Sequence, residues 1–370
     1  MGTMNELLNA AAVTALNNQL EAAAPGTAWT ALVAARTGVD GLSLRARSDL
    51  ISAALISDLP DDYRAVAAVF RRALAGASDS PAGFTGWMIW PVSETVTTLA
   101  LASTDPDAFD DGLALLAELT PRLTAEFAIR RFLEADLDRA LAAVRTWTGH
   151  PDEHVRRLAS EGTRQYLPWA IRVRALLARP EATLEILEAL RSDDSEYVRR
   201  SVANHLNDLR RDNADMVAAV AASWSIDADA NTRWIVRHGL RTLVKKAHPG
   251  ALAVMGFEAA TVTVSPLALD RDTVTLPGEL EFSFTVTNES DAAARLAVDY
   301  VVNYQKSNGS LAPKVFKLTT VTVAAGESVR LVKKHAFRPM TTRVHYPGAH
   351  SLELQINGAR HQLAHFVLAG

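Results

Sequence analysis

The sequence contains no cysteine among its 370 residues. The chain therefore forms no disulfide, has no thiolate nucleophile and offers no thiolate ligand to a metal. Every apolar run is interrupted by a charged residue before it reaches the length of about eighteen residues that a membrane-spanning helix needs. The first residues also lack a basic start followed by an unbroken apolar stretch, so we expect no signal peptide and a cytoplasmic protein.

Several familiar sequence motifs are missing as well. The chain has no GxxxxGK[ST], GxGxxG, HExxH or GxSxG, which argues against nucleotide binding, zinc proteolysis and serine hydrolysis. His150 and His154 lie one helical turn apart, but the sequence places no third ligand beside them. We therefore expect no metal site and no cofactor.

The chain is not strongly basic. Its net charge is -4, and residues 1–149 hold 11 Lys+Arg against 18 Asp+Glu, whereas the remaining residues are slightly positive. Affinity for phosphate comes from clustered cations. The overall charge does not point to a nucleic-acid partner, but local clusters of cations in the middle and C-terminal parts are compatible with one, so charge alone does not decide the question.

The first part of the chain has helical periodicity and repeats one short phrase. A phrase of one apolar residue and two basic residues recurs inside amphipathic helices, with spacings of 26, 43 and 38 residues, at Ile129-Arg130-Arg131, Val155-Arg156-Arg157, Val198-Arg199-Arg200 and Val236-Arg237-His238. These spacings bracket the period of about 40 residues that is typical of HEAT-type helix pairs. The pattern predicts an α-solenoid over residues 1–257, with a concave binding surface.

The periodicity changes near residues 257–262. Leu280, Phe282, Phe284 and Val286 alternate with polar neighbours, as in a half-buried strand, and similar runs follow. Asn357-Gly358 is a strong hairpin signal. About seven strands in this length predict an immunoglobulin-like β-sandwich over residues 262–370. The predicted fold class is therefore an α-solenoid of HEAT-like repeats followed by a β-sandwich.

Charged residues on two central helices are the candidates for chemistry. Arg157, Glu161 and Arg164 share one face of the first helix, and Asp208 lies one turn from Asn204 on the second. Glu161 is either a catalytic carboxylate or part of an ordinary surface ion pair, and the pattern alone favours the ion pair. Asp208 has the same two interpretations.

Other candidates are equally ambiguous from pattern alone. Glu126, at the start of a helix, is either a site carboxylate or a complement to the helix dipole. Trp169 follows Leu167-Pro168, where a core position is commoner than a stacking platform. Arg237, Arg241, Lys245 and Lys246 form either a phosphate-binding stripe or a solvated helix face, and Lys334 with its basic neighbours raises the same question in the β-region.

Longer phrases in the sequence resemble a known family, the AlkC-type DNA alkylation repair proteins, which are HEAT-like-repeat DNA glycosylases related to AlkD. The resemblance covers essentially the whole chain and is carried by LPDDY, TAEFAIRRF, HVRRLASEG, LPWA, YVRRSVANHLNDL and LRTLVKKAHPGAL, and then by KVFKL, KKHAFRP and HYPGAHSLELQING in the immunoglobulin-like part. The sequence departs from the expected pattern at Arg131 and Gln165, where we expect proline, and at His205, where we expect asparagine.

The resemblance implies hydrolysis of the N-glycosidic bond of cationic alkylated bases in double-stranded DNA. The expected base is 3-methyladenine, with 3-methylcytosine as a further candidate, and the sequence leaves 7-methylguanine open. It also implies a monomer that holds the DNA backbone and reaches the sugar without a base-flipping pocket, unlike most enzymes that act on bases.

The same resemblance assigns roles to individual residues. Glu161 and Asp208 match the positions of the catalytic carboxylates, and Glu126 is a third carboxylate beside them. Trp169 and Arg157 are expected to contact the substrate. The expected DNA contacts are Arg164, Arg200, Arg241, Lys245, Lys246 and Lys334.

A non-catalytic interpretation remains the alternative. A HEAT-like scaffold joined to an immunoglobulin-like module could bind DNA or protein without chemistry, and composition and periodicity fit both interpretations. The matches at Glu161 and Asp208 favour the enzyme, because a scaffold has no reason to keep carboxylates on a cationic face.

Overall fold

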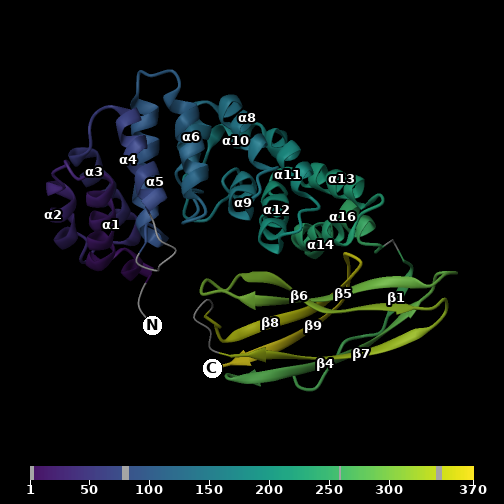
Figure 1. The fold of residues 1–370 in the computed structure, drawn as a ribbon. Helices are drawn as coiled ribbons and strands as arrows, with labels where there is room; N and C mark the ends of the chain where they lie inside the picture. Colours follow the sequence, from purple (N-terminus) through teal and green to yellow (C-terminus); the bar gives the residue numbers. More distant parts are fainter. Residues whose placement is uncertain (1–3, 77–82, 258–259, 339–343) are drawn as a thin grey trace. The chain divides into compact units, whose positions relative to one another are not determined.

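The computed structural model describes residues 4–76, 83–257, 260–338 and 344–370. Within these residues helices occupy the chain up to Val254, and strands begin at Val262 (Figure 1). The predicted order, an α-solenoid of HEAT-like repeats followed by an immunoglobulin-like β-sandwich, is confirmed.

The Cα positions divide the chain into two compact units. Unit 1 contains Met1–Leu209 with Asp229–Ile235, and unit 2 contains Arg210–Ala228 with Val236–Gly370. The last helices therefore group with the strands. The domain boundary that we predict from the sequence, between residues 257 and 262, stays a prediction, and residues 258–259 lie outside the described part of the chain.

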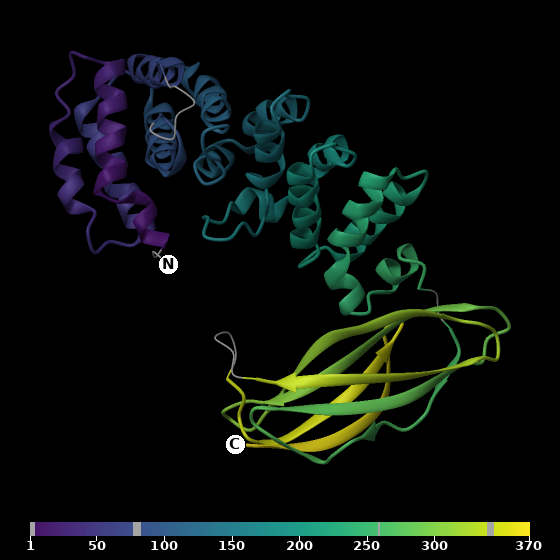
Figure 2. The same ribbon diagram turned by 60° about the horizontal axis from the view of Figure 1, so that its bottom comes forward.

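Unit 1 is built from helices that stack as consecutive pairs (Figures 1 and 2). The helices are η1 (Met4–Leu8), α1 (Ala10–Ala23), α2 (Thr30–Gly38), α3 (Leu44–Asp58), α4 (Tyr63–Gly76), η2 (Gly86–Met88), α5 (Ile89–Ala102), α6 (Ala108–Leu119), α7 (Ile129–Ala135), α8 (Leu137–Trp147), α9 (Glu153–Glu161), α10 (Arg174–Ala178), η3 (Pro180–Thr183), α11 (Leu184–Leu190) and α12 (Glu196–Leu209). Each amphipathic helix buries its apolar side chains against its neighbours, which stabilises the stack.

Two of these helices, α9 and α12, pack directly against each other. The α9 helix begins at Glu153, because the Asp152 side chain accepts a hydrogen bond from the backbone N–H of His154. It buries Val155 and Leu158, and α12 buries Val198, Val202, Leu206 and Leu209. The packing fixes the remaining faces of the two helices and hence the side chains on them.

Unit 2 holds four more helical segments and the sandwich. The helices are α13 (Ala214–Ser225), the second part of α14 (Ala230–Gly239), α15 (Arg241–Lys245) and α16 (Pro249–Val254). Leu252 and Phe257 form a small apolar cluster with Ala297 of a strand. The side chain of Gln355 also donates a hydrogen bond to the Lys245 carbonyl oxygen, at 3.1 Å. These contacts connect the last helices to the strands within unit 2.

The sandwich consists of two sheets whose inner faces form one core (Figure 2). Strand β4 (Gly278–Asn288) pairs with β1 (Val262–Val264), β2 (Ala268–Leu269) and β7 (Ser328–Phe337). The second sheet has the order β3 (Thr273–Thr275), β9 (Ala359–Ala369), β8 (Gly348–Ile356), β5 (Ala294–Gln305) and β6 (Leu311–Val323). Asn357 and Gly358 have positive φ and join β8 to β9, with Ile356 opposite Ala359, so the predicted hairpin is confirmed.

Candidate active site

Three segments of unit 1 bring the predicted carboxylates together. Glu161 ends α9, Asp208 lies in the last turn of α12, and Glu126 lies in the turn that precedes α7. Arg157 lies one helical turn before Glu161, so both side chains leave α9 on the same face. Arg164 follows in the loop after α9, which contains residues 163–173.

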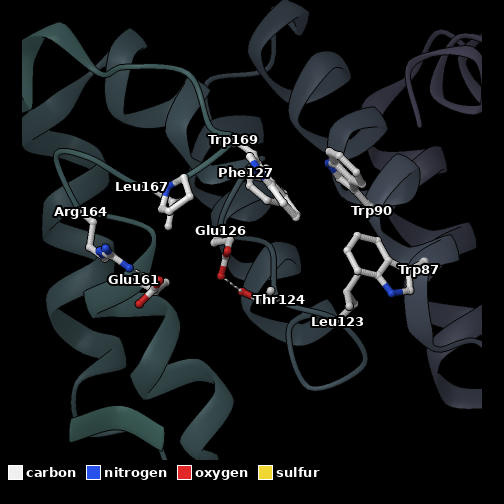
Figure 3. Close-up of a pocket in the computed structure, with 11 residues that line it drawn as sticks. Trp87, Trp90, Leu123, Thr124, Glu126, Phe127, Glu161, Arg164, Leu167 and Trp169 are labelled. Atoms are coloured by element: carbon white, nitrogen blue, oxygen red, sulfur yellow. Dashed lines mark hydrogen bonds and ion pairs between the residues drawn. The ribbon is translucent and has the colours of Figure 1, made fainter. Parts of the chain in front are cut away.

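These five side chains form a chain of alternating charges, which we name the charge network: Glu126, Arg157, Glu161, Arg164 and Asp208. Arg157 binds Glu126 and also lies 3.4 Å from Glu161 Oε1. Arg164 donates to Glu161 Oε1 at 2.6 Å through Nη1, and its Nε and Nη2 lie 2.8 Å from Asp208 Oδ2. One guanidinium therefore joins carboxylates from two successive repeats (Figure 3 shows Arg164 and Glu161).

Burial distinguishes this network from an ordinary surface ion pair. The side-chain exposures are 13% for Arg157, 8% for Glu161, 10% for Arg164 and 9% for Asp208. The interpretation of the Arg157-Glu161-Arg164 face as a solvated ion pair is therefore wrong. Burial opposes the charge on Arg164, but attraction by Glu161 and the hydrogen bond to Asp208 outweigh it and raise its pKa. The charged forms stabilise one another inside the fold.

The second oxygen of Glu161 is also held. Ser201 of α12 donates its hydroxyl to Glu161 Oε2 at 2.6 Å, and Ser201 Oγ lies 3.0 Å from Ser160 Oγ. His205, one turn further along α12, is fully buried between the Ser160 carbonyl oxygen and the Thr183 hydroxyl. Burial and the positive charge of Arg164 lower the pKa of His205 to about 3, so this imidazole is neutral. Glu161 thus has a fixed orientation.

Glu126 is bound by side chains rather than placed at a helix terminus. Helix α7 begins three residues later, at Ile129. The carboxylate accepts hydrogen bonds from the Thr124 hydroxyl, at 3.1 Å, and from Arg157. The guanidinium of Arg157 also lies over the Tyr197 ring, 4.9 Å from its centroid. The structure therefore makes Glu126 part of the charge network.

Trp169 lies in the loop after α9 and is 72% exposed. The alternative interpretation of Trp169 as a core residue is therefore wrong, and its expected contact with the substrate stays a prediction. Its backbone has a φ of 63°, a left-handed conformation that a bulky residue rarely adopts. The surrounding loop holds the indole away from the core and beside the charge network (Figure 3).

A cavity opens beside these residues (Figure 3). Its volume is about 290 Å³. We name it the aromatic cavity, because four aromatic side chains line it: Trp87, Trp90, Phe127 and Trp169. Three members of the charge network also line it, namely Glu126, Glu161 and Arg164. The remaining lining residues are Leu123, Thr124, Leu167 and Pro168. Apolar walls next to a few convergent charged groups are typical of ligand sites.

Arg130 anchors the loop that carries Arg164 and Trp169. This arginine of α7 is fully buried and donates to three backbone carbonyl oxygens of the segment, those of Gly162 (3.1 Å), Arg164 (2.8 Å) and Ile171 (2.6 Å). Burial, with the nearby charges of Arg172 and Arg164, lowers its pKa to about 10, so it remains charged at neutral pH. Its hydrogen bonds fix the loop conformation.

Sequence reasoning assigned no site role to Arg130, Ser201, Trp87 or Trp90. The repeated phrase holds one relevant signal, since the first arginine of the α9 and α12 copies binds backbone carbonyl oxygens. Arg156 binds those of His150 and Pro151, and Arg199 binds those of Asp193 and Asp194. A carbonyl-binding role for Arg130 follows from its place in the phrase, but no pattern identifies Ser201.

The predicted DNA contacts lie in different places. Arg164 is buried in the charge network, whereas Arg200 is exposed on α12 and pairs with Glu196. In unit 2, Arg241, Lys245 and Lys246 are exposed at α15, and Lys334 on β7 lies 3.4 Å from Glu281. The structure thus brings together the predicted carboxylates, Arg164 and Trp169. The other predicted DNA contacts lie outside the charge network: Arg200, Arg241, Lys245, Lys246 and Lys334.

Within residues 4–76, 83–257, 260–338 and 344–370, no group of three or more His, Asp or Glu side chains is arranged to hold a metal ion. His150 accepts a hydrogen bond from the Asp152 N–H, and His154 packs edge-on to Tyr197. In the same residues, every helix is too short or too polar to cross a membrane.

Comparison with known proteins agrees with the two-part fold. A model of the protein family described as "Uncharacterised protein YhaZ, C-terminal Ig-like domain" matches residues 263–370. The uncharacterized protein YhaZ of Bacillus subtilis (strain 168) is 34% identical over 318 residues, which are 86% of this chain and 85% of that protein. The solved structure of Pseudomonas fluorescens alkylpurine DNA glycosylase AlkC, bound to DNA containing an abasic site analog, matches 100% of both chains with a TM-score of 0.85 and 34% identity. The chain belongs to the AlkC family, with HEAT-like helical repeats followed by a C-terminal immunoglobulin-like domain.

Proposed function

We propose that this protein is a DNA glycosylase of alkylation repair that hydrolyses the N-glycosidic bond of cationic alkylated bases in double-stranded DNA. The observation that carries the proposal is the pair Glu161 and Asp208, two buried carboxylates from successive repeats held by one arginine beside an open cavity. The similarity to an alkylpurine DNA glycosylase bound to DNA supports it. Its main substrate is 3-methyladenine, with 3-methylcytosine as a second.

The chemistry suits a site of fixed carboxylates. An N3-alkylated adenine carries a positive charge, so the base leaves with the electrons of the glycosidic bond and needs no strong acid. The deoxyribose then develops oxocarbenium character, and water adds to its C1′ and releases a proton. A carboxylate that is already oriented stabilises this cation more than the ground state, which lowers the barrier.

The network gives each residue a role in the proposal. Glu161 and Asp208 face the sugar, and Glu126 is a third carboxylate. Arg157 and Arg164 act as positioning residues, because their guanidinium groups are buried between carboxylates instead of being available to phosphate. This replaces the sequence-based expectation that Arg164 contacts DNA.

The remaining expectations complete the proposal. Arg200, Arg241, Lys245, Lys246 and Lys334 are candidate phosphate contacts, because each is exposed to solvent. Trp169 contacts the damaged nucleotide from its exposed loop. The enzyme works as a cytoplasmic monomer and reaches the sugar without flipping the nucleotide into a pocket.

A direct assay tests the function against the scaffold alternative. Purified protein is incubated with 3-methyladenine-containing DNA in chelator, without nucleotide, and released bases are measured by chromatography. The enzyme releases free 3-methyladenine and leaves abasic sites, whereas a scaffold binds the DNA and releases nothing. The Glu161→Gln, Asp208→Asn double variant is the matched control, because it keeps the shape of both side chains.

A further inference from the structure

Contacts with residues outside the aromatic cavity hold one of its walls, the Trp90 side chain, in a fixed position. Trp90 lies 5.0 Å from Phe127 and 6.0 Å from Trp87, measured between ring centroids. The Trp90 indole N–H donates to Glu94 Oε1 at 3.1 Å, and Arg45 binds the same oxygen at 3.2 Å. The Arg45 guanidinium also lies over the Trp90 ring, 4.9 Å from its centroid. These contacts fix the indole, so the wall exists before any ligand arrives.

The volume of the cavity suits one fused aromatic ring system. Ligand pockets usually measure about 300 to 1,000 Å³, and an engineered apolar cavity of about 150 Å³ holds one benzene ring. The aromatic cavity, at about 290 Å³, is close to twice the latter. The cavity therefore has room for a two-ring purine.

The polar groups of the cavity match the edge of a purine. Thr124 and Glu126 lie on one wall, and Glu126 accepts hydrogen bonds from Thr124 and Arg157. A carboxylate has about four lone-pair positions, so it can accept a further hydrogen bond from the amino group of an adenine derivative. The aromatic side chains supply stacking surface for the ring faces.

We propose that the aromatic cavity is a subsite for the excised base, an alkylated purine, formed by Trp87, Trp90, Phe127 and Trp169 with Glu126 at its polar edge. The proposal rests on the proposed function, because only hydrolysis supplies the free base. The glycosidic bond breaks, its electron pair stays on the base and neutralises the positive charge, and the neutral purine moves into the cavity. Base flipping before cleavage is not required.

Binding of the free base tests the subsite without DNA. The full-length protein is titrated with 3-methyladenine and, separately, with the single-ring 3-methylcytosine, and binding is followed by calorimetry and tryptophan fluorescence. The purine binds at one site and the pyrimidine binds more weakly. Trp87→Ala lowers the affinity for 3-methyladenine roughly tenfold, in the range measured for loss of one aromatic stacking partner. Trp234→Ala is the control, because Trp234 lies on α14 and is not one of the residues that line the cavity.

The outcomes separate the subsite from the function. Base release from DNA with no binding of free 3-methyladenine overturns the subsite and leaves the glycosylase intact. Binding of 3-methyladenine that Trp87→Ala and a second variant, Phe127→Ala, leave unchanged also overturns it, because the base then binds elsewhere. The subsite is supported if Trp87→Ala and Phe127→Ala both weaken the binding of 3-methyladenine and Trp234→Ala does not. Added 3-methyladenine then inhibits turnover less in Trp87→Ala and Phe127→Ala than in Trp234→Ala.

Discussion

Helices α9 and α12 carry the same phrase, valine followed by two arginines, and use it differently. The first arginine makes the same backbone contacts in both copies, because Arg156 and Arg199 each bind the carbonyl oxygens five and six residues earlier. Arg156 also pairs with the Asp193 carboxylate. The second arginine differs. Arg157 is 13% exposed between two carboxylates, whereas the Arg200 side chain is 61% exposed and pairs with Glu196.

The comparison shows what turns a repeated surface motif into a site. After α9 the chain forms the 163–173 loop, which Arg130 anchors and which returns Arg164 to Glu161. Helix α12 then supplies Ser201 and Asp208 from the other side. A solvated pair contributes little to stability, but the buried network depends on every partner.

The largest expected difference between the two copies is in stability. Arg157→Met leaves Glu126 and part of Glu161 buried without their cation, so we expect a loss of about 3 kcal/mol in the free energy of unfolding. Arg200→Met removes a solvated i, i+4 pair and should cost less than about 0.5 kcal/mol. Urea unfolding of both variants measures this difference. Equal losses would show that burial does not distinguish the two copies.

Much of the fold follows from local signals in the sequence. The alternation of Leu280, Phe282, Phe284 and Val286 identifies strand β4, and Asn357-Gly358 identifies the β8–β9 hairpin, because both depend on neighbouring residues alone. The carboxylates were found through the resemblance to a family.

The rest of the site depends on contacts between distant residues. Arg164 and Asp208 are 44 positions apart, and only the packing of α9 on α12 brings them within 2.8 Å. The spacing of Arg157, Glu161 and Arg164 is the same whether solvent or another repeat covers them, so pattern alone favoured a surface pair. Pattern alone also favoured a core position for Trp169, because its exposure follows from a loop with positive φ that the pattern does not indicate.

The pH dependence of stability gives a second, smaller difference between buried and exposed residues, and it comes from His205, which is buried beside the charge network. Burial lowers the pKa of His205 in the folded protein to about 3, from its ordinary value of 6.5. The unfolded chain takes up a proton below pH 6.5 and the folded chain does not, so stability is fully present above that pH and is lost as the pH falls towards 3. The loss attributable to this group is about 2 kcal/mol at pH 5.

The variant His205→Asn isolates that loss. Asparagine does not titrate, so the decrease in unfolding free energy between pH 7 and pH 5 should be smaller by about 2 kcal/mol than in the wild type. Any packing defect affects both pH values alike and cancels in the difference. Parallel pH profiles for the two proteins would contradict a buried neutral imidazole.

The smallest expected effect concerns exposed cations. Arg241, Lys245 and Lys246 are exposed at α15, in contrast to the buried Arg157. Neutralising any one of them should weaken binding to damaged and undamaged DNA alike and lower the slope of log K against log salt by about 0.9. Fluorescence anisotropy over a range of salt concentrations measures the slope. Arg64→Ala is the control, because it removes an exposed cation of α4 that is paired with Asp105, between α5 and α6. An unchanged slope in Lys245→Ala removes that residue from the interface.

The single-turnover rate of base release tests the central claim, that the buried carboxylates of the network perform the chemistry. With enzyme in excess over 3-methyladenine-containing DNA, Glu161→Gln and Asp208→Asn should each slow release by roughly a hundredfold or more while DNA affinity stays nearly unchanged, because a carboxylate interacts most strongly with the oxocarbenium-like transition state. The matched control is Glu196→Gln, which alters the corresponding i, i+4 pair with Arg200 and should release base at the wild-type rate. Wild-type rates in Glu161→Gln and Asp208→Asn would contradict the account, because the base would then be released without these two carboxylates.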